Sequence, residues 1–123
     1  MEMTMTMFRS TIAAVAVTAG LFAANTASAF ERWVDVVNNG SSAIYSVFIT
    51  NVDDRSYGRD LLGNYMIPAG YQQRLEPDIN NGYCRFDVLI TYETGHEVAM
   101  WGVNLCEMTT IYTDGYNWDA DYI

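Results

Sequence analysis

Side chains with oxygen atoms gather in three segments between the hydrophobic stretches of the chain. The first segment holds Asn51, Asp53, Asp54 and Asp60, the second holds Glu76, Asp78, Asn80 and Asn81, and the third holds Asp114, Asn117, Asp119 and Asp121. Calcium-like hard cations bind several carboxylate, amide and carbonyl oxygens, usually on loops. We therefore expect a hard multivalent cation, calcium or a lanthanide, as the cofactor.

The first choice for this metal site is the set Asp53, Asp54 and Asp60, because the edge of a rigid sandwich can hold a loop in place. The second choice is Asp114, Asp119 and Asp121, which lie in a terminal segment. None of the three segments matches the spacing of an EF-hand. The alternative for each is a solvated acidic loop whose Asp and Asn side chains bond to their own backbone.

Few features of the sequence indicate a catalytic site. The only histidine, His96, follows Gly95 in a predicted turn, and nothing resembles a nucleophile elbow. Acidic residues are numerous, so a carboxylate pair for glycoside hydrolysis stays open, although no spacing selects one. We therefore expect a protein that is not an enzyme and has no catalytic residues.

The charge of the chain limits its partners. Aspartate and glutamate number 15 against 6 arginines, there is no lysine, and the net charge is −9. This balance argues against nucleic acid and anionic membranes as partners. It is compatible with cations or basic partners, and solubility alone is the alternative explanation.

Aromatic residues suggest a second class of function. The chain has nine tyrosines and three tryptophans. Those expected in loops or at edges are Tyr57, Tyr65, Tyr71, Tyr116, Trp118 and Tyr122. Aromatic rings beside acids suit a contact with protein or carbohydrate. The alternative function is thus a structural or interaction module of the cell envelope without metal, whose partner is a protein or a second copy of the chain.

The segment 83–106 predicts a β-hairpin. Phe86, Val88, Ile90 and Tyr92 occupy every second position, and Gly95 provides a turn. A simple register would place Cys84 opposite Asn104, and a bulge at Gly102 or Asn104 would bring Cys106 into register. We therefore expect a Cys84–Cys106 disulfide across the open end of the hairpin.

The first 29 residues have the features of a signal peptide. Arg9 precedes an apolar run over 12–24, and Ala27-Ser28-Ala29 matches a cleavage site. We expect cleavage after Ala29 and a periplasmic or secreted protein that does not contact the membrane afterwards. An uncleaved membrane anchor is the alternative. An oxidising compartment also agrees with a disulfide.

Further strands are predicted over 32–38, 43–51, 71–76 and 107–113, with a short edge strand over 64–67. We expect the strand over 43–51 to be central, Leu61 and Leu62 to fill the core, and Asp60 to bond to the local backbone, with a turn of helix at 60–62. The predicted fold is all-β, a small antiparallel β-sandwich of six or seven strands with one disulfide. Residues 30–113 would form this domain, and 114–123 an acidic aromatic tail.

Five short stretches carry a resemblance to a known family. They are S-x-x-I-Y-S-V-F-I-T at 41–50, Y-G-R-D-L-L-G at 57–63, I-P-A-G at 67–70, Y-C-R-F-D-V at 83–88 and W-G-V-N-L-C at 101–106. Their order resembles small exported proteobacterial β-sandwich proteins with a D-L-L-G loop and a hairpin cysteine pair, mostly without an assigned activity. In size, leader and acidity the chain also resembles the landiscernin family of periplasmic lanthanide-binding proteins. That resemblance implies a lanthanide ligand but places no ligand residue in this sequence.

Overall fold

Seven strands and no helix make up the part of the chain that the computed structural model describes, which is residues 32–56, 58–78 and 81–123. The strands are β1 (Val34–Asn38), β2 (Ile44–Asn51), β3 (Gln72–Leu75), β4 (Arg85–Tyr92), β5 (Glu97–Asn104), β6 (Met108–Thr113) and β7 (Trp118–Tyr122). Within these residues, no helix is long and apolar enough to cross a membrane. The predicted signal peptide, residues 1–29, lies outside them.

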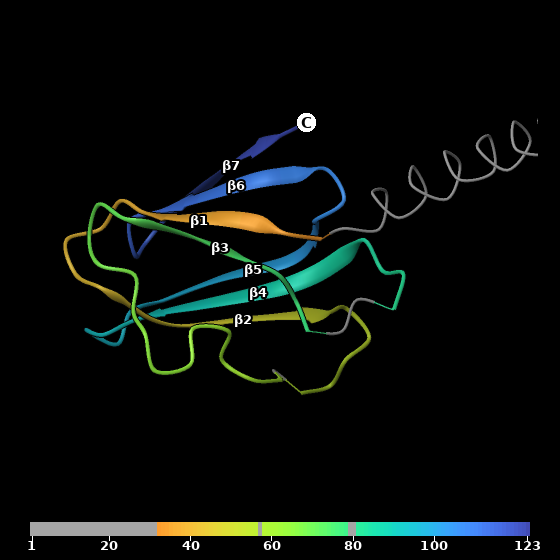
Figure 1. The fold of residues 1–123 in the computed structure, drawn as a ribbon, viewed down its shortest axis with the longest axis horizontal. Helices are drawn as coiled ribbons and strands as arrows, with labels where there is room; N and C mark the ends of the chain where they lie inside the picture. Colours follow the sequence, from red (N-terminus) through yellow and green to blue (C-terminus); the bar gives the residue numbers. More distant parts are fainter. Residues whose placement is uncertain (1–31, 57, 79–80) are drawn as a thin grey trace, which may run out of the picture. The chain divides into compact units, whose positions relative to one another are not determined.

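The strands form two sheets that lie one over the other (Figure 1). One sheet has the order β3-β1-β6-β7 and the other has the order β2-β4-β5. Every neighbouring pair is antiparallel except β1 and β6, which run parallel. The prediction of a small all-β sandwich with one disulfide is therefore confirmed, and the parallel pair is the departure from a purely antiparallel arrangement.

The hairpin of β4 and β5 contains the predicted bulge. Val88 pairs with Met100, but Phe86 pairs with Val103, so Asp87 faces both Trp101 and Gly102. Gly102 has a φ of 64°, a left-handed conformation that glycine adopts without strain. Its amide donates to Oδ1 of Asp87 at 2.9 Å. The side chain opposite the bulge thus stabilises it.

The bulge also explains the disulfide. It shifts the register by one residue, so Leu105 lies opposite Cys84 and its amide donates to the Cys84 carbonyl at 2.8 Å. A turn that starts at Asn104 then carries Cys106 back to Cys84, and the two cysteines are bonded. The predicted Cys84–Cys106 pairing is confirmed.

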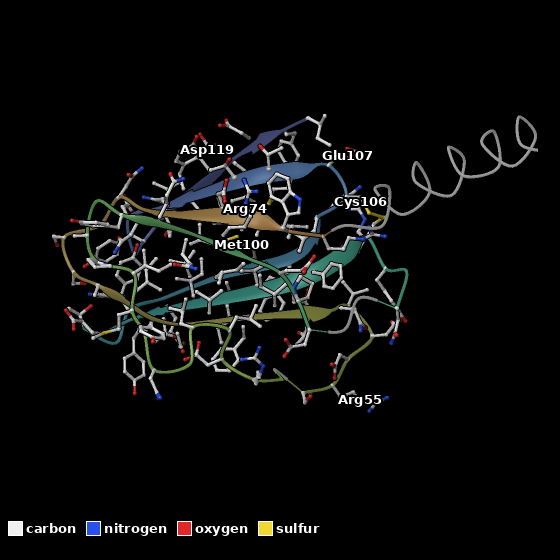
Figure 2. The ribbon with its side chains drawn as sticks, viewed as in Figure 1. Arg55, Arg74, Met100, Cys106, Glu107 and Asp119 are labelled. Atoms are coloured by element: carbon white, nitrogen blue, oxygen red, sulfur yellow. A yellow bond between two sulfur atoms is a disulfide. The ribbon has the colours of Figure 1, made fainter. Side chains whose placement is uncertain are left out.

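The hydrophobic core lies between the two sheets. The three-stranded sheet contributes alternate residues of β4 and β5, among them Phe86 and Met100, and Met100 is labelled in Figure 2. The facing sheet contributes Val34, Val36 and Ile111, all of which are completely buried. Hydrophobic burial of this kind is the main favourable term in folding.

A buried polar group joins the sheets near the end of β4. The Tyr92 hydroxyl lies 2.9 Å from Oδ1 of Asn38 in β1 and 3.0 Å from the carbonyl of Thr113 in β6. The side-chain amide of Asn38 donates to the carbonyls of Ser42 and Ile67. Gly40 is required beside this group, because a Cβ there would lie 2.9 Å from the Tyr92 ring. All these buried polar atoms have partners.

Strand β2 differs from the prediction, because it is an edge of its sheet rather than a central strand. Its free side is covered by the following loop: the Leu61 amide donates to the Val47 carbonyl at 2.9 Å, and Ile67 forms a single bridge to Ile44. The predicted strand over 64–67 is reduced to that bridge, and the predicted helical turn at 60–62 is a hydrogen-bonded turn. The loop thus covers the edge of β2 that no other strand pairs with.

The segment 114–123, expected to be a tail, instead contributes β7, which pairs with β6. Asp119 and Asp121 lie on one side of β7, and the partly buried Ala120 packs against the core from the other. Pairing to β6 satisfies backbone groups that a free tail would leave to water.

The disulfide gives the first prediction. Replacing Cys84 or Cys106 by Ser should lower the free energy of unfolding by about 2–5 kcal/mol, because the link restricts the unfolded chain. Urea unfolding of the purified protein, with and without reductant, measures this cost. Rapid labelling of both thiols in the native, unreduced protein would contradict the pairing.

Candidate functional site

The carboxylates of the first-choice metal site point to different local partners. Oδ2 of Asp53 accepts from the Tyr83 hydroxyl at 2.6 Å, and Oδ1 of Asp54 accepts from the amide and hydroxyl of Ser56. Asp60 accepts from two backbone amides of the sandwich. Among the described residues, no three His, Cys, Asp or Glu side chains lie together so that they could hold a metal ion. The structure therefore does not bring Asp53, Asp54 and Asp60 together as a ligand set.

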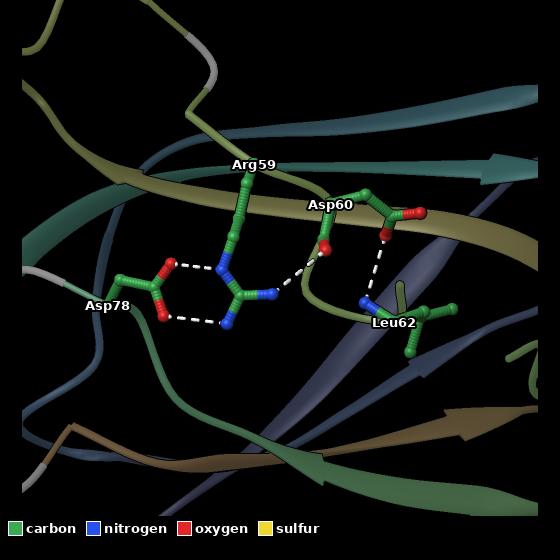
Figure 3. A network of polar contacts seen from close by, with 4 residues as sticks. All are labelled: Arg59, Asp60, Leu62 and Asp78. Atoms are coloured by element: carbon green, nitrogen blue, oxygen red, sulfur yellow. Dashed lines mark hydrogen bonds and ion pairs between the residues drawn. The ribbon is translucent and has the colours of Figure 1, made fainter. Parts of the chain in front are cut away.

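Asp60 has a structural position in this loop. Its Oδ1 accepts from the Val47 amide in β2 at 3.0 Å. The same oxygen accepts from the Leu62 amide, also at 3.0 Å, and Figure 3 shows this second bond. Leu62 is buried, so the predicted roles of Asp60 and Leu62 are confirmed. Leu61 is only partly buried and packs against the core, so its prediction holds in part. The carboxylate satisfies an amide on the free side of β2 and fixes the turn that inserts Leu62.

The second acidic segment is tied to the same loop. Arg59 forms a two-bond ion pair with Asp78, with its Nε 2.5 Å from Oδ2 and its Nη2 2.9 Å from Oδ1 (Figure 3). These hydrogen bonds lower the pKa of Asp78. Asn80, another member of this segment, lies outside the described residues. Asp78 thus connects two loops at the surface.

The second-choice metal residues are also bonded locally. Oδ1 of Asp114 accepts from the amides of Asn117 and Tyr116 at 2.8 and 2.9 Å, and these bonds lower the pKa of Asp114. Asp121 accepts from the Tyr112 hydroxyl at 2.6 Å, which raises the pKa of that tyrosine. Asp114 and Asp119, but not Asp121, line an open cavity of about 330 Å³ together with Asn39, Asn117 and Trp118. The structure therefore brings two of the three predicted carboxylates to one cavity, beside two amides.

His96 lies against an aromatic side chain. Its Nε2 is 2.9 Å from the Tyr116 hydroxyl, and the two ring centroids are 4.5 Å apart. This contact connects the turn between β4 and β5 to the turn between β6 and β7.

The outer face of the three-stranded sheet carries a row of apolar side chains. Phe48, Leu89 and Ala99 form one row across β2, β4 and β5, on the side away from the core. Trp101 follows on β5 with 67% of its surface exposed. Sequence reasoning missed Trp101 as a surface residue, although its alternation with buried Val98 and Met100 places it on the outer face.

The outer face of the four-stranded sheet, in contrast, carries charged and polar side chains. Arg74 of β3 pairs with Asp35 of β1 at 2.9 Å and lies 3.8 Å from the centroid of the Trp33 ring. The Asp35 pKa is lowered by its hydrogen bonds from Arg74. Tyr112 and Asp121 continue the polar surface across β6 and β7. Trp101 and its apolar neighbours therefore belong to the three-stranded sheet.

A small cavity lies at the Trp101 end of that apolar face. It has a volume of about 180 Å³ and is lined by Thr50, Asp54, Arg55, Ser56, Asp87 and Trp101. The strands provide Thr50, Asp87 and Trp101, and the loop after β2 provides the other three. Figure 2 shows Arg55 on this loop, away from the core residue Met100. The cavity thus combines one aromatic ring with hydrogen-bond donors and acceptors.

Comparisons of the chain with protein-family models, with curated proteins and with solved structures found no match. The resemblance to small exported sandwich proteins and to the landiscernin family therefore stays a prediction.

The position of Asp60 gives the second prediction. Asp60→Ala should destabilise the protein by about 1–3 kcal/mol, because the Val47 and Leu62 amides lose their acceptor. Asp60→Asn is the matched control, since its side-chain oxygen still accepts both bonds. Thermal and urea unfolding of the two variants test this. Equal, negligible losses would mean that the Asp60 bonds do not hold the loop.

Proposed function

We propose that the protein is an exported, non-enzymatic binding module of the bacterial cell envelope that recognises its partner with the outer face of the three-stranded sheet. The observation that carries this proposal is Trp101, a large aromatic side chain that is 67% exposed beside Leu89 and Ala99. Aromatic residues are enriched at protein interfaces. Tryptophan is among the residues that contribute most to binding energy.

The rigidity of this face supports the proposal. Strand β5 is held to β4 by the hairpin, by the bulge at Gly102 and by the disulfide beyond its end. A preformed surface loses little conformational entropy when a partner binds. The acidic side chains described above form local bonds, so the sandwich uses many of its charges for its own structure.

The third prediction tests binding to the cell envelope. Purified protein should sediment with an isolated envelope fraction of the producing bacterium, and Trp101→Ala should release most of it, because the variant removes the exposed ring. Trp118→Ala is the matched control, since Trp118 is 40% exposed on the other sheet. Circular dichroism confirms that both variants fold. If the wild type stays in the supernatant, or if only Trp118→Ala releases it, the proposed binding face is wrong.

Binding of a hard cation is the second candidate function. The observation that favours it is the open cavity at the turn between β6 and β7, which is lined by Asp114, Asp119, Asn39 and Asn117. Carboxylate and amide oxygens suit calcium and lanthanide ions. The net charge of −9 also favours a multivalent cation over an anion. Trp118 lines the same cavity and would sensitise a bound lanthanide.

The fourth prediction tests this metal site with terbium and excitation of the aromatic residues. If the cavity binds the ion, wild type shows sensitised emission and Asp114→Asn/Asp119→Asn loses it, because two ligand charges disappear while Trp118 stays in place. Asp53→Asn/Asp54→Asn is the control and should keep the emission. Loss in the control alone would return the site to the first loop, and absence of both emission and a calorimetric signal in wild type would refute the cation function.

A further inference from the structure

We infer that the cavity beside Trp101 binds one ring of a neutral saccharide. This inference rests on the proposed function and names the chemical class of the ligand for that face. It uses three properties of the cavity: the aromatic ring at its edge, the free hydrogen-bonding atoms of its polar side chains, and its size and charge.

The backbone next to the aromatic ring is held by side chains. Trp101 precedes Gly102 in the bulge, and the Gly102 amide donates to Asp87 at 2.9 Å while its carbonyl accepts from Arg85, also at 2.9 Å. These two bonds hold the backbone on the C-terminal side of Trp101. A pyranose ring has a face of C–H groups, and a flat indole with a negative π-face is complementary to it.

The polar side chains can bind sugar hydroxyls. Asp87 uses Oδ1 for the Gly102 amide and Asp54 uses Oδ1 for Ser56, so in each carboxylate Oδ2 remains to accept from a hydroxyl. Arg55 lines the same cavity, is exposed, and has no carboxylate partner among the described residues. Donors and acceptors that converge on one small cavity match the alternating hydroxyls of a sugar, and hydrogen bonds to charged groups are the stronger ones.

The size and charge of the cavity further restrict the class of ligand. The volume of 180 Å³ is below the roughly 300–1,000 Å³ of pockets for drug-sized ligands, so the cavity fits a single small ring. Two carboxylates and one guanidinium line it, and the whole chain carries −9. An anionic sugar would be repelled, which leaves a neutral one. The guanidinium also makes the cavity a poor site for a bare cation.

The first experiment screens the full-length mature protein against soluble neutral oligosaccharides of glucose, xylose and N-acetylglucosamine, with an oligogalacturonate as the anionic probe. Ligand-detected NMR suits the millimolar affinity expected for one ring with few contacts, about 1 mM. We expect at least one neutral probe to bind and the anionic probe not to bind. Trp101→Ala should weaken binding at least about tenfold, equivalent to about 1.4 kcal/mol. Trp118→Ala should bind as wild type does.

Further variants test the polar side chains. Arg55→Gln and Thr50→Val should each weaken binding of the same neutral probe several-fold, because both residues line the cavity. Neither change should alter the fold seen by circular dichroism. No binding of any neutral probe at about 10 mM, or binding that Trp101→Ala leaves unchanged, would overturn the inference.

A second experiment separates this inference from the proposed function. The envelope fraction is treated with periodate, which cleaves vicinal diols of sugars, or with protease, before sedimentation with the protein. Loss of binding after periodate but not after protease supports a saccharide ligand. Loss after protease alone overturns the saccharide and leaves the binding module intact. If the untreated fraction binds no protein, the proposed function fails, and the soluble probes alone decide whether the cavity binds sugar.

Discussion

The hydrogen bonds of the buried Tyr92 hydroxyl hold the two sheets in their relative position. They reach Asn38 in β1 and Thr113 in β6, so one side chain of the three-stranded sheet contacts both central strands of the other. Burial raises the pKa of Tyr92, which keeps the hydroxyl neutral. A buried polar atom without its partner costs about 1–3 kcal/mol, so this end of the sandwich tolerates only one register between the sheets. The disulfide at the start of β4 closes the open end of the β4–β5 hairpin.

With the two sheets held together and the core filled by apolar residues, polar chemistry is left to the loops and outer faces. Carboxylates in the loops mostly accept from nearby backbone amides or hydroxyls, as Asp54 and Asp114 do. The high content of acidic residues therefore reflects hydrogen bonds within the loops as well as any bound ligand. The two outer faces are then free to differ: one carries the Arg74–Asp35 pair, and the other carries Trp101.

Local patterns in the sequence were sufficient to predict much of this fold. The alternation from Phe86 to Tyr92 predicts the hairpin, and the offset of the cysteines predicts a bulge at Gly102 or Asn104, which the structure has at Gly102. The parallel pairing of β1 with β6 was not predictable, because short strands so far apart in the chain carry no local trace of their partner. Strand β7 was missed since Asp119 and Asp121 resemble a solvated tail. For the candidate metal site, the sequence places Asp53, Asp54 and Asp60 in one loop but does not determine where their carboxylates point. The cavity at Trp101 could not be predicted either, because it forms where a loop packs against a face of the sheet.

The parallel pairing of β1 and β6 also constrains the order of assembly. Strand β1 is central in its sheet, yet both of its neighbours, β3 and β6, come from later parts of the chain. During synthesis from the N-terminus, one edge of β1 stays open until β3 is available, and the other stays open until Met108–Thr113 is available. The β4–β5 hairpin, in contrast, closes over a short loop, which carries a small entropic cost. The four-stranded sheet therefore forms late, because its central pair joins the first strand to the sixth.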